Sequence, residues 1–442
     1  MATRTHAPDH PLRRMAGNAV GRALRVLRRH RIPEIGDCTL ALLLDPYRFV
    51  GRTCAEIGSD VFASRFLLRP TLFLMGQEGA ELFSNPAYFQ RRGAVPLRLQ
   101  RTLLGRGGVQ TLDGERHHWR KAMFMSLVGP EQVQRLVSLT LRHLKSRAQG
   151  WPGFIDIDFY EEMRNVLTRA VCAWAGLPLS EAEVPLRTQQ LTALFDQVAL
   201  FGPPHWRSLY MRRQAERWTR DVVRQVRKGK FTTPENSALF TVAWQRDSDG
   251  GLLKLHTAAV ELLNVLRPVV AVSVYAVFTA MALEAHPDWR EKLARGNGRM
   301  LEAFVQEVRR FYPFFPQAVA RTRCRFEWKG LRFRKGVRVM LDLHATNHDP
   351  RLWDAPDTFR PERFLEQAVG AYGFIPQGAG DHYVNHRCPG EGITVELLKV
   401  VAKFLARDVN FELDAEDREI NWRRLPPLPR GEFMLRNVEV MQ

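Results

Sequence analysis

Apolar residues recur at helical spacing along most of the chain. In residues 130–146 the apolar positions are Val133, Leu136, Val137, Leu141 and Leu144. These positions share one helical face, and the proline at position 130 suits a helix start because its missing N–H needs no partner there. Similar patterns predict helices over residues 160–175, 181–199, 206–228, 252–285 and 300–311. The longest of them, 252–285, is predicted to be a central helix.

Short segments with alternating polarity lie between these helices. Residues 61–68 and 71–75 predict two strands joined at Arg69-Pro70. Residues 326–336 predict a hairpin, which is followed by a strand over 337–343. Residues 431–440 alternate like a closing pair of strands. The predicted fold class is therefore mainly α with small β-sheets.

The composition is typical of a globular protein with a large core, since 45% of the 442 residues are hydrophobic and 25% are charged. The chain has no internal repeat and no low-complexity linker, so residues 38–442 are predicted to form a single domain. Residues 1–37 form a basic leader that contributes to a formal net charge of +18. We interpret this leader as a solvated, flexible segment, and weak contact with an anionic membrane surface is the alternative.

Five cysteines are scattered along the chain, at positions 38, 54, 172, 324 and 388. An odd and widely spaced set indicates a reducing compartment, predicted to be the cytoplasm, and argues against a disulfide framework or a zinc cluster. The longest uncharged run, residues 268–283, is too short to span a membrane. The positive charge is diffuse and matches no nucleic-acid-binding motif. Only Cys388 stands in an unusual local sequence.

Cys388 closes a glycine-rich run that begins at Phe374 and leads into an apolar periodic segment starting at Ile393. This pattern predicts a loop that carries a thiol to the N-terminus of a long helix, with Pro389 in the first helical turn. Free backbone N–H groups and the helix dipole favour a thiolate at such a position. A thiolate is a good nucleophile and a good soft metal ligand, and the loop by itself leaves both uses open.

Two further motifs narrow the choice. Glu307 and Arg310 lie three residues apart on one helical face, and a Pro-Glu-Arg-Phe sequence that contains Arg363 follows them. The order of these motifs before the cysteine loop resembles that of the cytochrome P-450 superfamily of haem-thiolate enzymes. The resemblance implies a fold with a long central helix over haem b and the cysteine loop beneath it. It also implies that Cys388 ligates the iron and that Glu307, Arg310 and Arg363 form a buried structural triad.

The chain differs from ordinary members of that superfamily at two places. Phe374 lies much further before Cys388 than the equivalent phenylalanine usually does. The central helix has no acid–alcohol pair, and Arg267 and a kinking Pro268 stand where that pair is expected. Both differences are shared by the bacterial fatty-acid peroxygenases, which use hydrogen peroxide in place of dioxygen and a reductase. The sequence is similar to that branch over nearly its whole length, and most of all to its fatty-acid α-hydroxylases.

Arg267 is chemically notable without any resemblance, because an arginine in an apolar helix is costly unless it is paired. Pairing with an internal acid, or reaching outward to solvent, is the ordinary structural interpretation. The missing acid–alcohol pair instead favours a role in binding a carboxylate through two hydrogen bonds. The resemblance implies that the carboxylate belongs to the substrate and acts as general acid–base beside the haem, with Arg267, Pro268 and Cys388 as the catalytic residues.

The remaining site residues come from the resemblance. By sequence alone, His117 and Lys121 are ordinary surface residues one helical turn apart. The resemblance places both of them, together with Arg91, at the haem propionates, and histidine stands at position 344 where the family usually has a tyrosine near a propionate. The substrate pocket is expected to contain Arg267, Gln110, Leu104 and Phe314. By the same resemblance, glutamine at 110 indicates hydroxylation where members biased to alkene-forming decarboxylation often have histidine, and leucine at 104 is typical of the α-selective hydroxylases.

These observations predict hydroxylation of long-chain fatty acids with hydrogen peroxide as oxidant, mainly at the α carbon and partly at the β carbon. The predicted enzyme needs no redox partner, binds no nucleic acid and does not span a membrane. One alternative is a conventional haem monooxygenase that depends on a redox partner docked on the basic surface. The other is a non-catalytic protein that binds haem or fatty acid.

Overall fold

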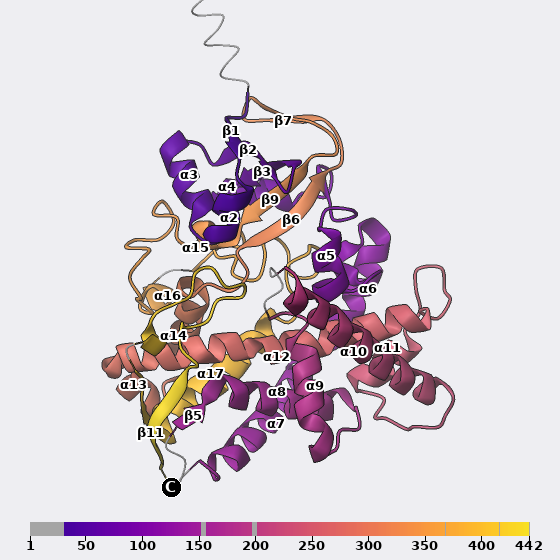
Figure 1. The fold of residues 1–442 in the computed structure, drawn as a ribbon, viewed down its shortest axis with the longest axis vertical. Helices are drawn as coiled ribbons and strands as arrows, with labels where there is room; N and C mark the ends of the chain where they lie inside the picture. The colour runs from indigo at the N-terminus through magenta and orange to yellow at the C-terminus, as the bar shows by residue number, and fades with distance from the viewer. Residues whose placement is uncertain (1–30, 152–155, 197–200, 367, 415, 442) are drawn as a thin grey trace, which may run out of the picture.

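The computed structural model describes residues 31–151, 156–196, 201–366, 368–414 and 416–441. Residues 1–30 of the predicted leader, which was placed at residues 1–37, lie outside the described part of the chain. A mostly helical region and a smaller sheet region lie side by side (Figure 1). The fold is mainly α with small sheets, as predicted.

The helices of the first half of the chain are α2 (Thr39–Leu44), α3 (Phe49–Ile57), α4 (Gly76–Ser84), α5 (Leu97–Leu99), α6 (Gly114–Ser126), α7 (Pro130–Ala148), α8 (Phe159–Ala175), α9 (Val184–Thr192) and α10 (Pro203–Arg227). The others are α11 (Ala238–Trp244), α12 (Leu255–Ala285), α13 (Pro287–Ala294), α14 (Gly298–Phe311), α15 (Leu343–Asn347), α16 (Arg363–Glu366) and α17 (Glu391–Arg407). Short π or 3₁₀ turns are η1 (Gln100–Leu104), η2 (Val109–Thr111), η3 (Glu181–Glu183) and η4 (Glu416–Arg418). The helix predicted over 181–199 is shorter than expected, because a separate turn, η3, precedes α9.

The main sheet has six strands in the order β1-β2-β3-β9-β6-β4. Their bounds are β1 (Glu34–Asp37), β2 (Val61–Phe66), β3 (Arg69–Leu74), β4 (Phe89–Gln90), β6 (Gln317–Thr322) and β9 (Arg338–Asp342). β1 pairs with β2, so the predicted start of the folded domain at residue 38 is too late. A two-stranded hairpin, β7 (Phe326–Trp328) with β8 (Leu331–Phe333), confirms the hairpin predicted over 326–336.

The turn between β2 and β3 differs from the prediction. Leu67 and Leu68 form it, and both have positive φ, 51° and 61°. Arg69 already belongs to β3 and pairs with Phe66. Two positive-φ residues match the right-handed twist of the paired strands, and that geometry does not require proline in the turn. Arg69-Pro70 is therefore the start of a strand, where proline is tolerated.

The C-terminal segment forms one strand where a pair was predicted. Strand β11 (Met434–Val440) lies between β10 (Val409–Glu412) and β5 (Asp156–Asp158). Both of its neighbours are antiparallel to it. The alternation of this segment therefore marks a central strand whose two partners come from distant parts of the chain.

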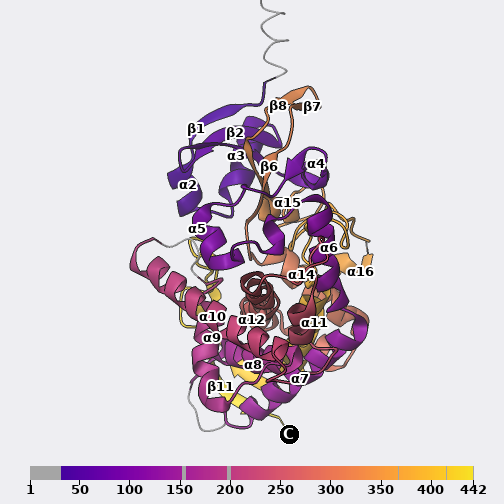
Figure 2. The ribbon, with the colours of Figure 1, turned by 90° about the vertical axis from the view of Figure 1, so that its right-hand side faces the viewer.

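Helix α12 is the core of the helical region and runs toward the viewer in Figure 2. It packs against α8, α10 and α17, and its apolar residues are almost all buried. By length and composition it could cross a membrane, but 94% of its most apolar window is buried within the protein, which is typical of a core helix. Pro268 lies inside it and leaves the carbonyl of Asn264 without the usual helical N–H partner. The helix nevertheless continues from Leu255 to Ala285.

A pair of histidines, His344 and His348, is packed on and just after α15. The rings of His344 and His348 have centroids 4.1 Å apart. His344 also contacts the edge of Tyr47 and lies 5.6 Å from the ring of Trp422. Burial lowers the pKa of His344 well below its usual value and lowers that of His348 to about 4. Both imidazoles are therefore neutral in the folded protein near pH 7.

We expect the His344–His348 pair to make stability fall in mild acid. The folded-state pKa of His348 is below the unfolded value of about 6.5, so the unfolded chain binds more protons between pH 4 and 6.5. The free energy of unfolding should therefore drop as the pH is lowered through this window, by about 2 kcal/mol for His348 between pH 7 and 5. Urea unfolding at both pH values should show that His348→Gln removes this part of the pH dependence. An unchanged pH dependence would contradict the assignment.

Candidate functional site

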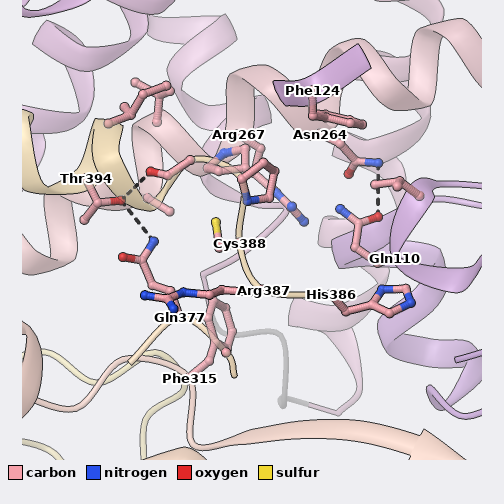
Figure 3. Close-up of a pocket in the computed structure, with 18 of the residues that line it drawn as sticks. Gln110, Phe124, Asn264, Arg267, Phe315, Gln377, His386, Arg387, Cys388 and Thr394 are labelled. Atoms are coloured by element: carbon pink, nitrogen blue, oxygen red, sulfur yellow. Dashed lines mark hydrogen bonds between the residues drawn. The ribbon is translucent and has the colours of Figure 1, made fainter. Parts of the chain in front are cut away.

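One cavity of about 400 Å³ lies between α12 and the loop that precedes α17 (Figure 3). Cys388 and Arg267 both line it, and they come from the loop and from α12 respectively. The segments η1 and η2, helix α6 and the residues before β6 complete the wall. The cavity therefore brings together the two residues on which the sequence analysis depends.

The backbone of the loop holds Cys388 in place. Its N–H donates to the carbonyl of Gln377 at 3.0 Å. The Gln377 side chain is fixed in turn, because its nitrogen donates to Thr394 at 3.0 Å (Figure 3). Its oxygen accepts from Arg309, also at 3.0 Å. Helix α17 begins at Glu391, so Pro389 lies before the helix and the prediction that it occupies the first turn was wrong.

Burial raises the pKa of the Cys388 thiol, and the Glu391 carboxylate acts in the same direction. The backbone N–H of Gly390 donates to the sulfur and, with the charges of Lys121 and Arg309, opposes this shift. The helix end alone therefore does not produce the thiolate predicted from the sequence. A metal ion on the sulfur would deprotonate it outright.

A buried ion-pair network, which was not predicted from the sequence, connects the loop to α14 and α17. Arg309 on α14 pairs with Glu391 at the start of α17. Arg387, next to the cysteine, pairs with the other oxygen of the same carboxylate at 2.6 Å. The pair with Arg309 had no sequence signal because Glu391 lies far along the chain, and Arg387 precedes the helix in a loop whose shape the sequence does not give.

The predicted triad is assembled next to this network. Two nitrogens of Arg310 contact Glu307 at 2.7 and 2.8 Å, and Arg363 lies 3.2 Å from the same carboxylate. All three side chains are buried. Arg310 and Arg363 also donate to backbone carbonyls between residues 347 and 360, so the triad connects α14 to that long loop.

Arg267 points from α12 into the cavity above Cys388 (Figure 3). One guanidinium nitrogen donates to the carbonyl of Leu103. Within the part of the chain that the structure describes, no carboxylate lies at ion-pair distance from it. Burial lowers the pKa of Arg267 to about 9, and the nearby Arg212 adds to this effect. The guanidinium is thus a buried, unneutralised cation at the top of the cavity.

Helix α12 carries a second buried charged residue, Glu261, whose charge is neutralised by an arginine of the protein. Glu261 accepts from Arg120 of α6 at 2.7 Å, and the two side chains are almost fully buried. Asn264 donates to the other oxygen of Glu261 at 2.9 Å and to Gln110 at 3.4 Å. Glu261 therefore orients the amides of Asn264 and Gln110, and the buried Asn264 oxygen is left without a hydrogen-bond partner.

Basic side chains gather at one edge of the cavity. His117 and Lys121 line it, and burial lowers their pKa values to about 4 and about 8. His386, which the sequence analysis missed, stacks on His117 with ring centroids 3.8 Å apart. Arg91 lies close enough to lower the pKa of both histidines, and burial lowers its own pKa to about 10. The only sequence signal for His386 was its place two residues before the cysteine.

The side chains of the buried Lys121 and the half-buried Arg91 donate hydrogen bonds to carbonyl groups, and of the two only Lys121 lines the cavity. Lys121 donates to the carbonyls of Asn385 and Arg387, and the Arg91 guanidinium donates to that of Val319. Such an edge suits a ligand that carries carboxylates. His344, in contrast, is absent from the cavity wall, so the tyrosine that it replaces has no counterpart at this edge.

The apolar wall includes the predicted residues Leu104 and Phe314. Phe314 stacks on Tyr275 of α12 with ring centroids 4.8 Å apart. Leu104 ends η1, where Gly105 follows with φ of 79°. A Cβ at Gly105 would clash with the side chains of Arg212 on α10 and Val260 on α12, and the positive φ also favours glycine at this position.

Comparison with known proteins identifies the family. The family description "Cytochrome P450" matches residues 294–429. Among curated proteins, the chain is 34% identical to cytochrome P450 71A8 of Mentha piperita over 131 residues, which is 28% of this chain and 25% of the relative. It is 35% identical to psoralen synthase of Ammi majus over 118 residues, or 26% of this chain and 23% of the relative. The matched part thus spans about a quarter of the length of these relatives.

Solved structures match far more of the chain. Cytochrome P450SP alpha (CYP152B1) in complex with (R)-ibuprophen is 46% identical, with a TM-score of 0.89 over 91% of this chain and 99% of the other. Cytochrome P450EX alpha (CYP152N1) with myristic acid is 40% identical, with a TM-score of 0.89 over 92% and 99%. A variant of cytochrome P450 OleT in complex with arachidonic acid is 30% identical, with a TM-score of 0.90 over 93% and 99%. The chain therefore belongs to the cytochrome P450 family, within the CYP152 branch of fatty-acid peroxygenases that its sequence resembles.

Membership of this family implies haem ligated by a thiolate, and the cavity fits it. Cys388 offers one soft ligand, and no cluster of three metal-binding side chains occurs among the described residues. A single sulfur suits an iron that a macrocycle also ligates. The cation Lys121 lines the cavity, and a cation there fits a group that carries carboxylates, as haem b does in its propionates.

Substitutions at Arg120 and Glu261 test whether their buried ion pair anchors α6 to α12. Glu261→Ala leaves the buried Arg120 with only the partly exposed Asp247, so we expect a loss of about 3–5 kcal/mol in the free energy of unfolding. The double variant Arg120→Met with Glu261→Leu removes both charges and should recover most of that loss. Urea unfolding of the two variants and the unchanged protein measures this. A cost below about 1 kcal/mol for Glu261→Ala would show that the pair is not a structural anchor.

Proposed function

We propose that this enzyme hydroxylates long-chain fatty acids with hydrogen peroxide, mainly at the α carbon and partly at the β carbon. The observation that carries the proposal is Arg267, a buried guanidinium that faces the cavity and has no carboxylate partner among the described residues. Burying a charge without a partner is costly unless a ligand supplies the opposite charge. A fatty-acid carboxylate is such a ligand.

The geometry of Arg267 favours binding of a carboxylate. The carbonyl of Leu103 holds one guanidinium nitrogen, which fixes the plane of the group and leaves other N–H donors for a ligand. Paired N–H donors match the two oxygens of a carboxylate. Gln110 and Asn264 lie beside this position with amide orientations set by Glu261. The acid end of the substrate is therefore held near Cys388.

Hydrogen peroxide as oxidant is supported by what lines the cavity. Haem, when bound through Cys388, supplies the oxidising chemistry, and its thiolate ligand favours cleavage of the O–O bond. The cavity wall contains neither Asp nor Glu among the described residues, so none of these residues offers a carboxyl group there to deliver protons. A substrate carboxylate held by Arg267 can take the proton from one oxygen of hydrogen peroxide. It then returns that proton to the other oxygen, which leaves as water when the O–O bond breaks.

The same geometry supports attack close to the carboxyl group. With its carboxylate held by Arg267 above Cys388, the substrate presents its α and β carbons to the site of oxidation. The apolar wall, which includes Leu104 and Phe314, receives the rest of the chain. Each buried CH₂ contributes about 0.8 kcal/mol, so a chain of ~14 methylenes offers up to ~11 kcal/mol before the costs of association. Long chains are thus favoured over short ones.

We also propose that the enzyme works in a reducing, cytoplasmic compartment and needs no reductase. The five cysteines are all free, which supports such a compartment. A conventional, reductase-dependent monooxygenase is less well supported, because the cavity wall lacks the acid that proton delivery to bound dioxygen would use.

The proposal predicts the product of a simple assay. The haem-loaded enzyme, a saturated long-chain fatty acid and hydrogen peroxide should together give mainly the 2-hydroxy acid, without NADPH or a reductase. Gas chromatography with mass spectrometry of the extracted acids identifies the position. Products oxidised near the chain end, or turnover that appears only with a reductase, would refute the proposal.

Arg267→Ala should separate substrate binding from haem binding. The variant should keep its haem spectrum, because Arg267 contacts neither the triad nor the Arg309–Glu391 network. Fatty-acid turnover should fall by at least ~100-fold, since both the anchor and the positioned acid–base are lost. Arg142→Ala, which changes an exposed arginine on α7, is the matched control and should retain activity. Full activity in Arg267→Ala would rule out the role given to this residue.

A further inference from the structure

We propose that the surface formed by α5 and the N-terminal part of α10 docks on an anionic lipid bilayer. Its apolar members are Leu97, Phe201, Trp206 and Tyr210, whose exposed fractions are 65, 56, 67 and 56%. We call these residues the α5–α10 patch. Soluble proteins rarely expose a contiguous group of large apolar side chains of this kind unless it binds something.

Contacts show that the patch is continuous. The Arg98 guanidinium of α5 lies 3.8 Å from the ring centroid of Phe201, just before α10. Trp206 and Tyr210 are four residues apart and share the outer face of α10, while the opposite face buries Ser208 and Arg212. α5 continues directly into η1, which contacts α10. Figure 2 shows α5 and α10 on the same side of the molecule.

The charges around the patch select an anionic partner. Exposed arginines surround the apolar residues at positions 101, 207, 213 and 217. The only acid in residues 97–108 and 201–217 is Glu216, which is already paired with Arg212 at 2.7 Å. Apolar and aromatic side chains bordered by arginine are typical of a helix that lies in the interface of an acidic membrane. Tryptophan and tyrosine also prefer the headgroup level of a bilayer.

The patch shares a segment with the cavity. Leu103 and Leu104 of η1 line the cavity, only a few residues after Leu97 and Arg98 on α5. Arg212 of α10 donates to the carbonyls of Thr102 and Leu103, so α10 and η1 are held together. A bilayer bound at the patch would therefore contact the segment that forms the wall beside Arg267. A lipid-like substrate could be drawn from that bilayer.

Vesicle cosedimentation of the full-length, haem-loaded protein tests the proposal. The protein should bind vesicles that contain phosphatidylglycerol more strongly than vesicles of phosphatidylcholine alone, and added salt should weaken the binding. Trp206→Gln and Arg213→Glu should each lower the association constant roughly fivefold. The matched controls are Trp244→Gln, an exposed tryptophan on α11, and Arg142→Glu on α7, which should bind like the unchanged protein.

Three results would overturn the proposal. The protein could fail to bind anionic vesicles, or the patch variants could bind as well as the unchanged protein, which would assign binding to another surface such as the basic leader. Gel filtration could instead show that the patch variants separate a dimer into monomers, with no vesicle binding, which would make this face an interface between copies. The assay contains neither fatty-acid substrate nor peroxide, so its outcome is independent of the proposed reaction.

Discussion

The layout of the cavity depends on how α12 accommodates buried charge. Glu261 and Arg267 lie on the same helix and both are buried, but only Glu261 has an internal partner of opposite charge among the described residues. The Arg120–Glu261 pair connects α6 to α12 and orients the amides beside the cavity. Arg267 is then free to pair with a ligand because the adjacent charge is already neutralised. Pairing the two residues with each other would have removed the binding site.

Buried charges have a different role on the cysteine side of the cavity. There a network of ion pairs holds the loop, through Arg309, Glu391 and Arg387 beside it and through the triad next to them. Buried ion pairs contribute little net stability but fix position, because breaking one leaves a charge without a partner. The sulfur of Cys388 is thus held on a rigid support, while the opposite wall keeps one charge for the substrate.

The sequence was most informative where chemistry depends on a few residues at short spacing. Cys388 and Arg267 stand out by local pattern, one in a glycine-rich loop before a helix and the other in an apolar helix, whereas the role of the Glu307–Arg310 pair came from the family resemblance. The Arg309–Glu391 and Arg120–Glu261 pairs could not, since each joins segments that only the tertiary fold brings together.

Local turn chemistry also limited the prediction. The β2–β3 turn was placed at Arg69-Pro70 because proline usually marks a turn, whereas strand pairing determines its real position at Leu67 and Leu68. The short strand β1 was assigned to the leader because four residues with little alternation give no sequence signal. The overall fold class and most of the predicted helices, which rest on longer patterns, were predicted well, with the segment 181–199 as the exception.

The absence of acidic side chains from the described cavity wall has a consequence for the resting enzyme. An oxidant activated in an empty site would attack the protein itself. If the proton carrier arrives only with the substrate, peroxide that enters an empty site meets no partner able to help cleave it. The fatty acid would then be both the substrate and the group that activates peroxide, so the enzyme would not damage itself in a cell that contains peroxide but no substrate.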